Sequence, residues 1–212
     1  KKGTFGKFEK EVHTTKSKGM KREEALEIIL KELKPNTIIV STTGKTSREI
    51  FDIREQRGQS HHQDFLTVGS MGHCSSIALG IAIAKPDREV ICIDGDGSII
   101  MHMGSLSTVG KLKPKNFYHI LINNRVHESV GGQATSARFI DIPELVKANG
   151  YNNVFFTSDE EKLTSQVRGF IKETGPNFLE VKVKPGSRDD LGRPTVKPVD
   201  NKNAFMNFVQ EK

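Results

Sequence analysis

The chain has 212 residues, of which 35% are hydrophobic and 27% are charged, as is usual for a globular protein. No apolar run approaches the roughly 20 residues that span a bilayer, and no apolar stretch follows the lysine-rich start, so we expect neither a membrane protein nor a secreted one. The two cysteines, Cys74 and Cys92, lie in apolar contexts and fit a reducing, cytoplasmic setting.

The net charge of +6 is concentrated at the N-terminus. Residues 1–22 contain eight basic and two acidic residues, whereas the remaining residues contain 24 of each sign. We therefore predict a basic N-terminal arm or linker over 1–21 and a domain with almost no net charge over 22–212. Since a nucleic-acid-binding domain carries clustered basic residues on its own surface, we expect no nucleic-acid partner.

Helical and strand patterns alternate in the first half of the chain. Ala25, Ile28, Ile29 and Leu33 recur at helical intervals, which predicts a helix over 22–33. The next predicted elements are, in chain order, a strand over 37–41, a helix over 47–56 with Ser47 as its N-cap, a buried helix over 75–84, a strand over 88–95 and a helix over 103–112.

The second half continues this alternation. Asp141 and Gly150 are typical residues for the start and the end of a helix, which we expect over 141–150. The other predicted elements are strands over 117–123, 153–157 and 177–183 and helices over 159–174 and 201–212. Alternation of this kind predicts an α/β fold, a three-layer α/β/α arrangement with a mainly parallel sheet.

Polar and glycine residues follow three of the predicted strands, at 41–44, 95–98 and 123–133. In parallel sheets the loops after the strands carry the ligand chemistry, so we expect these segments to form one site.

The strongest pattern is Gly95-Asp96-Gly97 after one strand and Asn123-Asn124 at the end of the next, with residues 98–122 between them. Glycines allow the backbone to approach a ligand closely. A carboxylate and an amide oxygen suit Mg²⁺, which completes its octahedron with phosphate and water. Gly-Asp-Gly alone is ordinary turn chemistry, but its combination with the paired asparagines is far more specific.

This combination resembles the cofactor motif of the thiamine diphosphate (ThDP)-dependent enzymes. The resemblance implies that Asp96 and Asn124 ligate Mg²⁺ through their side chains and that Val126 does so through its main-chain carbonyl. It also implies that the diphosphate is contacted by Gly95, Gly97 and Ser98.

Two further segments resemble cofactor-binding parts of the same enzymes. Ser41, Thr42, Thr43 and Gly44 would help to hold ThDP. In the turn Gly69-Ser70-Met71-Gly72, Met71 resembles the bulky apolar residue that bends ThDP into a V shape. Gly69 and Ser70 would flank the cofactor in this turn.

Within that family, the chain resembles the phosphonopyruvate decarboxylases most closely. The similar segments are 41–51, 64–82, 102–110, 127–133 and 188–195. The resemblance implies the ThDP-binding fold and decarboxylation of a 2-oxo acid with an anionic tail, 3-phosphonopyruvate, to phosphonoacetaldehyde and CO₂ in phosphonate biosynthesis. The sulfopyruvate decarboxylases fit the general plan but match these segments less well.

The resemblance covers the C-terminal half of such an enzyme. In this family the glutamate that activates ThDP comes from a pyrimidine-binding domain, which we do not find in this chain. We therefore expect the chain to be inactive by itself and to need that domain in a longer chain or as a separate subunit. The complete enzyme would be a homo-oligomer with its site at an interface.

Arg125, His73 and His127 each allow more than one role in this pattern. Arg125 stands where the family tends to have glycine, which is costly if the loop needs a positive φ. His73 and His127 flank motif glycines and either contact substrate, transfer a proton or serve as ordinary hydrogen-bonded loop residues. The substrate's anionic tail has three candidate partners, Arg125, Arg138 and Arg188.

Other interpretations of the motifs have weaker support. A ThDP-fold module that binds or assembles without catalysis stays open because of Arg125. A dinucleotide or flavin site fails because Ile100 replaces the third glycine of its fingerprint, and a P-loop fails because Ile39 replaces its first glycine. His61-His62 lacks further ligands at zinc spacing, which favours a solvated loop pair.

Overall fold

The computed structural model describes residues 19–211, so residues 1–18 of the predicted arm lie outside the described residues. The described residues contact the core from Met20 on, two residues before the first helix begins. Met20 is buried in the core, and its carbonyl accepts a hydrogen bond from the backbone N–H of Lys184 at 2.9 Å.

A six-stranded parallel sheet forms the centre of the fold, in the order β2-β1-β3-β4-β8-β7. The strands are β1 (Ile38–Ser41), β2 (Asp64–Leu66), β3 (Val90–Gly95), β4 (Phe117–Asn123), β7 (Asn153–Thr157) and β8 (Asn177–Lys182). A separate antiparallel ribbon joins β5 (Val126–His127) to β6 (Gln133–Ala134) just after β4.

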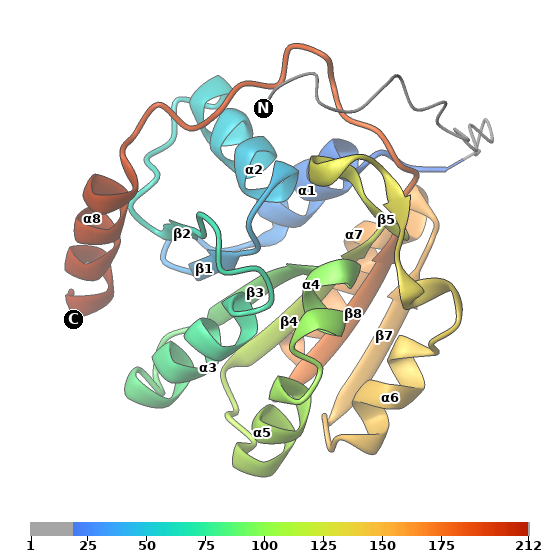
Figure 1. The fold of residues 1–212 in the computed structure, drawn as a ribbon. Helices are drawn as coiled ribbons and strands as arrows, with labels where there is room; N and C mark the ends of the chain where they lie inside the picture. The colour runs from blue at the N-terminus through green and yellow to red at the C-terminus, as the bar shows by residue number, and fades with distance from the viewer. Residues whose placement is uncertain (1–18, 212) are drawn as a thin grey trace.

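Helices cover both faces of the sheet (Figure 1). One face packs against α1 (Arg22–Glu32), α2 (Lys45–Gln56) and α7 (Glu160–Lys172). The other packs against α3 (Cys74–Ala84), α4 (Asp96–Met101), α5 (Ser105–Leu112), α6 (Ile142–Ala148) and α8 (Pro198–Gln210). The 3₁₀ turns η1 (Glu128–Val130) and η2 (Ser136–Arg138) follow β5 and β6. The predicted three-layer α/β/α arrangement is confirmed.

Each face of the sheet has its own apolar core, because successive strand residues point to opposite faces. On β3, Ile91 and Ile93 face α1, α2 and α7, whereas Val90 and Cys92 face the other helices. Burial of both faces explains why the central strands read as continuous apolar runs in the sequence.

Most element predictions are confirmed, with shifts of a few residues at the ends. Asp141 caps α6 as predicted, since its side chain accepts a hydrogen bond from the N–H of Glu144. The prediction that Ser47 caps a helix is wrong: α2 begins at Lys45 after Gly44, and the Ser47 hydroxyl donates to the carbonyl of Thr42. The three-residue strand β2 was not predicted, because so short a segment shows no clear alternation.

The chain leaves β1 toward β2 on one side and reaches β3 on the other, so the strand order reverses between β1 and β3. Such a switch point leaves a crevice at the carboxyl ends of the two strands. The segments 41–44 and 95–98 therefore meet at one edge of the sheet.

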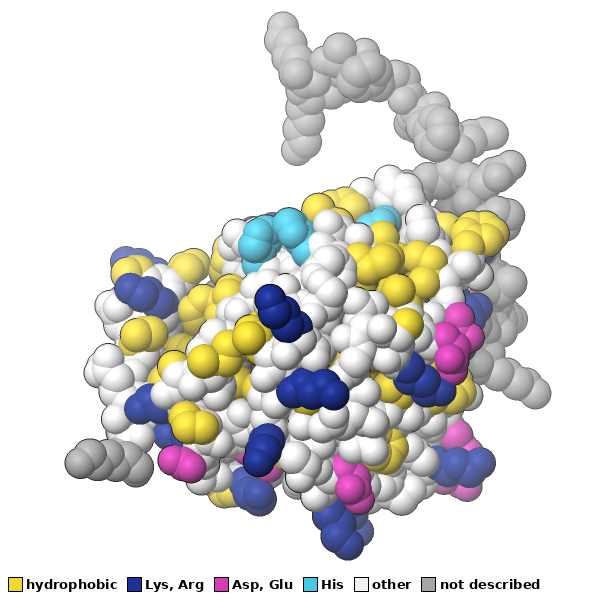
Figure 2. All heavy atoms as spheres, turned by 90° about the horizontal axis from the view of Figure 1, so that it is seen from below, with side chains coloured by type: hydrophobic (Ala, Val, Ile, Leu, Met, Phe, Trp, Pro, Cys, Tyr) yellow, Lys and Arg dark blue, Asp and Glu magenta, His cyan; other side chains and the backbone are white. Residues whose placement is uncertain are grey.

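Among residues 19–211, no helix combines the length and the apolar character needed to cross a membrane. Figure 2 shows lysine and arginine side chains standing separately on one face among uncharged atoms and a few acidic side chains. This face presents no continuous basic patch of the kind that a nucleic-acid backbone would contact.

Gly110 provides a test of how tightly the helical layer is packed. A Cβ at this position would lie 1.5 Å from the carbonyl oxygen of Asn149, at the end of α6, whereas a Cβ at Gly80 in α3 would meet no atom within 4 Å. We expect Gly110→Ala to lower the free energy of unfolding by at least about 3 kcal/mol. The matched change Gly80→Ala should instead raise it by about 0.5–1 kcal/mol. Urea unfolding of both variants checks this, and equal effects would contradict the packing described.

Candidate functional site

A cleft opens at the carboxyl ends of β1, β3 and β4, where the strand order predicts a ligand site. Ten residues predicted from the sequence line it: Thr42, Thr43, Met71, Gly95, Asp96, Gly97, Ser98, Asn124, Val126 and His127. These ten residues come from four segments that are far apart in the chain. The edge of the sheet brings the segments together in one cleft.

Other predicted residues do not line the cleft. Ser41 is buried behind it, with its hydroxyl 2.7 Å from that of Ser47. Gly44 borders the cleft, because a Cβ there would be 3.4 Å from Ser129 Oγ. Gly69 and Ser70 form the turn next to Met71, with φ values of 74° and 45°.

The cleft also contains Glu128, Ser129 and Val130, which belong to the segment 123–133 expected at the site, and four residues that the sequence did not predict: Arg22, Lys45, Thr46 and Ile122. Lys45 and Thr46 follow the predicted segment 41–44 directly, so the strand-end rule could have included them. Arg22 belongs to α1 and carries no local sequence signal for a role in this cleft.

Asp96 is the first residue of α4 and is 3% exposed. Burial raises the pKa of its carboxyl group, and a hydrogen bond donated by the Thr135 hydroxyl offsets part of this shift. No lysine or arginine of the described residues pairs with this carboxylate. A buried carboxylate with only neutral donors is a site where a cation would gain a large electrostatic stabilisation.

The loop after β4 turns through an unusual conformation. Arg125 has φ = 61°, in the left-handed region that disfavours side chains. The N–H of Arg125 donates to Asn123 Oδ1 and the N–H of Val126 donates to Asn124 Oδ1, both at 3.1 Å. Position 125 therefore does have the positive φ that would make a side chain costly there, and its neighbours Asn124 and Val126 line the cleft.

Gly97 allows two side chains to close over α4. A Cβ at this position would lie 2.5 Å from His127 Cε1 and 3.0 Å from Met71 Cε. Any larger residue would therefore displace both groups. The glycine requirement inferred from the motif has a direct steric cause here.

The turn that carries Met71 is fastened on both sides. The N–H of Gly69 donates to Thr43 Oγ1 at 3.0 Å, next to β1, and the N–H of Gly72 donates to Ser98 Oγ at 3.1 Å, in α4. These two hydrogen bonds hold Met71 at the cleft, between the loop after β1 and the start of α4.

The two candidate histidines differ in position. His127 lines the cleft. His73 is exposed, with its Nδ1 3.2 Å from the carbonyl oxygen of Ser70, and its ring centroid lies 4.2 Å from that of His102. His102 begins the similar segment 102–110 but had not been predicted as a site residue.

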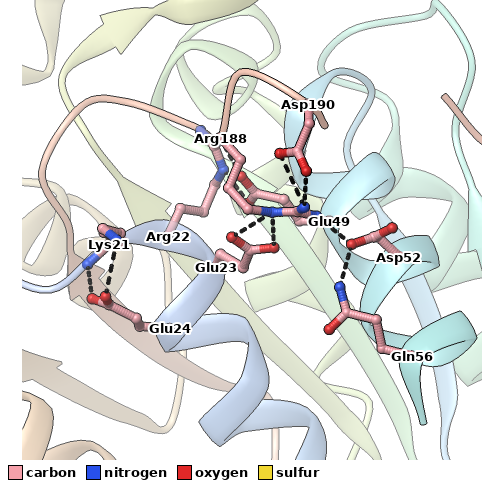
Figure 3. Close-up of polar contacts among 9 residues, drawn as sticks. All are labelled: Lys21, Arg22, Glu23, Glu24, Glu49, Asp52, Gln56, Arg188 and Asp190. Atoms are coloured by element: carbon pink, nitrogen blue, oxygen red, sulfur yellow. Dashed lines mark hydrogen bonds and ion pairs between the residues drawn. The ribbon is translucent and has the colours of Figure 1, made fainter. Parts of the chain in front are cut away.

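Of the candidate anion partners, Arg188 is occupied by protein carboxylates. Figure 3 shows its guanidinium between Glu23 of α1, Asp52 of α2 and Asp190. Arg125 and Arg138 are exposed. Three carboxylates engage all three guanidinium nitrogens of Arg188 and anchor the C-terminal segment to the two helices.

Arg22 is a second anchored arginine, buried at the cleft wall. It forms a bidentate pair with Glu49 at 2.6 and 2.7 Å and a further ion pair with Glu128. Glu128 also accepts the N–H of Gly186. This network connects α1, α2, the loop after β5 and the C-terminal segment around the mouth of the cleft.

A layer of buried polar groups lies beneath the cleft. Asp94 Oδ1 accepts the N–H of Gly95 at 2.8 Å, and Asp94 Oδ2 is 3.4 Å from His119 Nε2. Although burial opposes it, His119 holds the pKa of Asp94 below its usual value. Cys74 and Cys92 are buried and free, as predicted, and burial raises the pKa of the Cys92 thiol well above its usual value.

The donor set fits a magnesium–diphosphate group. Asp96 offers a carboxylate oxygen, Asn124 an amide oxygen and Val126 a carbonyl oxygen in the same cleft. Hard oxygen ligands of this kind suit Mg²⁺, which retains sites for phosphate oxygens. Gly95, Gly97 and Ser98 supply backbone and hydroxyl groups beside them.

Known proteins are similar to this chain in both sequence and fold. Residues 42–181 match the family described as "Thiamine pyrophosphate enzyme, C-terminal TPP binding domain", where TPP is another name for ThDP. The chain is 40% identical over 190 residues to a phosphonopyruvate decarboxylase of Streptomyces hygroscopicus, which covers 90% of this chain and 46% of that protein. The chain thus spans about half the length of the first curated relatives it matches.

The chain is also 33% identical over 183 residues to the sulfopyruvate decarboxylase subunit beta of Methanococcus maripaludis, covering 86% of this chain and 95% of that subunit. A solved structure from Mycobacterium smegmatis, provisionally described as a thiamin diphosphate-dependent enzyme, superposes with a TM-score of 0.66 at 19% identity. It covers 80% of this chain and 32% of that one. At this identity the structural match supports the fold alone.

Arg125 permits a test of the strained loop. We expect Arg125→Gly to be about 1 kcal/mol more stable toward unfolding than Arg125→Ala, because both variants lose the charge and only glycine escapes the cost of the positive φ. Urea denaturation of the two variants measures this difference. Equal stabilities would show that position 125 is not strained.

Proposed function

The chain belongs to the thiamine pyrophosphate enzymes through their C-terminal TPP-binding domain, and from this premise we propose that it forms the C-terminal half of a ThDP- and Mg²⁺-dependent decarboxylase. The proposed reaction converts 3-phosphonopyruvate to phosphonoacetaldehyde and CO₂, a step of phosphonate biosynthesis. The observation that carries the proposal is the buried carboxylate of Asp96, which faces the same cleft as Asn124 and Val126 and has no cationic partner among the described residues.

In the proposed complex, Mg²⁺ is held by Asp96, Asn124 and the carbonyl of Val126. The diphosphate is contacted by Gly95, Gly97 and Ser98 on one side of the cleft and by Thr42, Thr43 and Gly44 on the other. Ser41 supports the second group from behind, through its contact with Ser47. This arrangement places the anion between two strand-end loops, as the switch point of the sheet favours.

ThDP, when bound, supplies the electron sink that decarboxylation requires, and the protein's task is to bind and orient it. Met71 is assigned the apolar contact that bends the cofactor, supported by the fastening of its turn to Thr43 and Ser98. His127 is assigned to substrate contact or proton transfer at its imidazole, because it lines the cleft. His73 is the weaker candidate, since it stands outside the lining.

The proposal includes a pyrimidine-binding domain as partner, either in the same polypeptide or as a second subunit, within a homo-oligomer. Two relatives support this division: the phosphonopyruvate decarboxylase of S. hygroscopicus extends over about twice the matched length, whereas the subunit beta of M. maripaludis is matched over 95% of its length. The free, buried cysteines support a reducing compartment, and we place the protein in the cytoplasm.

The sulfopyruvate decarboxylases provide the second candidate function. The near-complete match to a sulfopyruvate decarboxylase subunit beta favours it, whereas the higher identity to phosphonopyruvate decarboxylases favours the first. Both substrates are 2-oxo acids with an anionic tail. A module that binds ThDP without catalysis would retain Asp96 and Asn124 and show no turnover.

Asp96→Asn tests the cofactor site. We expect the substitution to abolish Mg²⁺-dependent ThDP binding in the complemented protein, as measured by calorimetric titration. In the metal-free chain the same substitution should raise the melting temperature at neutral pH, because an amide is cheaper to bury than an unpaired carboxylate.

Asp64→Asn is the matched control. Asp64 is also fully buried, but Arg54 pairs with it at 3.0 and 3.1 Å, so its loss should lower the melting temperature and leave ThDP binding intact. If Asp96→Asn still bound ThDP with wild-type affinity, the assignment of the metal site would be wrong.

A turnover assay tests the reaction and the need for the partner. The chain alone should release no CO₂ from phosphonopyruvate with ThDP and Mg²⁺ present, and the chain joined or mixed with its pyrimidine-binding half should do so. Parallel assays with sulfopyruvate decide between the two substrates by the ratio of their kcat/KM values. Decarboxylation by the isolated chain would contradict the required partner, and binding without turnover of either substrate would favour the non-catalytic module.

A further inference from the structure

Asn123, the first residue of the asparagine pair, points away from the proposed ligands and into the protein. It is 3% exposed and does not line the cleft. Its Oδ1 accepts the N–H of Arg125 at 3.1 Å, and its Nδ2 donates to Glu180 Oε1 at 2.6 Å. These two partners fix the orientation of the amide, because its oxygen must face the N–H and its nitrogen must face the carboxylate.

Glu180 lies on β8, the strand beside β4, and is 2% exposed. The register pairs it with Leu121 and pairs Asn123 with Lys182, so the two side chains are diagonal neighbours on one face of the sheet. Among the described residues no lysine or arginine forms an ion pair with Glu180, and Asn123 is its one hydrogen-bond donor. Burying this carboxylate between Leu179 and Val181 carries a desolvation cost that the single hydrogen bond from Asn123 offsets only in part.

The hydrogen bond to Arg125 stabilises a turn that the sequence itself disfavours. A positive φ at a residue with a side chain costs about 1–2 kcal/mol. The loop therefore keeps this conformation because its neighbours hold it: Asn123 holds the Arg125 N–H, and the N–H of Thr135 on the facing ribbon donates to the Arg125 carbonyl at 3.0 Å. Arg125 separates the two proposed ligands, Asn124 and Val126.

We propose that Glu180 is a positioning residue for the metal site. It fixes the Asn123 amide, the amide holds Arg125 in its left-handed turn, and the turn presents the Asn124 side chain and the Val126 carbonyl to one ion. This inference rests on the proposed function, since the ion is the Mg²⁺ assigned to that site. It gives the first asparagine of the pair a task different from that of the second.

Metal affinity separates this role from a merely structural one. In the complemented protein we would titrate Mn²⁺ in the presence of saturating ThDP and follow free Mn²⁺ by electron paramagnetic resonance. Loss of groups that orient ligands typically lowers metal affinity about 10- to 100-fold. We expect Glu180→Leu to show a loss of that size, and Glu180→Gln, which keeps an acceptor oxygen for Asn123, to stay within about threefold of wild type.

A reciprocal exchange tests the contact itself. Asn123→Asp should lose at least about tenfold in Mn²⁺ affinity, because two carboxylates then face each other. In the double variant with Glu180→Gln, the amide introduced at position 180 donates a hydrogen bond to the carboxylate introduced at position 123. The other oxygen of that carboxylate still accepts the N–H of Arg125. The double variant should therefore recover most of the affinity.

Asp64→Asn is again the control, a buried carboxylate changed to an amide at the edge strand β2. It should lower the melting temperature and leave Mn²⁺ affinity unchanged. The inference is overturned if Glu180→Leu loses no more affinity than this control, or if the double variant binds no better than Asn123→Asp.

Hydrogen exchange at the Arg125 amide keeps the test independent of the proposed function. In the metal-free chain we expect this amide to exchange at least about tenfold faster in Glu180→Leu than in wild type, because its acceptor is no longer held. If wild type binds no Mn²⁺, the proposed function fails, and this exchange rate still decides whether Glu180 positions the loop. An unchanged rate would refute the positioning role.

Discussion

The fold holds the carboxylate of Asp96 at the cleft in a place where an ionised group is unfavourable without a cation. Its burial and its neutral hydrogen-bond partner Thr135 leave it without compensating charge among the described residues. The rest of the site follows from this constraint. The β5–β6 ribbon brings Thr135 to one side of the carboxylate, and the loop after β4 brings amide and carbonyl oxygens to the other. A divalent ion would complete an arrangement that the polypeptide leaves unbalanced.

Basic residues around the cleft have mostly structural partners. Arg22, which lines the cleft, pairs with Glu49 of α2 and with Glu128 of η1. Arg188 pairs with Glu23 of α1, Asp52 of α2 and Asp190 (Figure 3). Guanidinium groups that are saturated by carboxylates fix the geometry of the elements they join. In the proposed complex, the charge that balances an anionic ligand would come from the ion, from backbone N–H groups and from Lys45, which lines the cleft without an ion pair among the described residues.

Strain and support occur together in the loop after β4. Arg125 adopts a conformation that suits glycine. Hydrogen bonds to Asn123 and Thr135 offset the free-energy cost of its positive φ. Local strain of this kind persists only where the surrounding structure determines it. The buried Glu180 on the neighbouring strand is part of that surrounding structure, which extends the functional unit from the cleft into the sheet.

The sequence by itself determined the alternation of helices and strands, the three-layer class and the residues at the strand ends. These features depend on local periodicity, on the positions of the glycines and on the spacing of Asp96 and Asn124, all of which can be read from the sequence alone. It could not place Arg22 or Glu180 near the site, because their positions depend on which strands and helices become neighbours. It also misassigned Ser47, whose hydroxyl turns toward β1 once the sheet forms. Only the tertiary structure decided that Arg188 pairs with protein carboxylates and that Glu180 holds the Asn123 amide beside Arg125. Hydrogen bonds between residues far apart in sequence leave no local pattern.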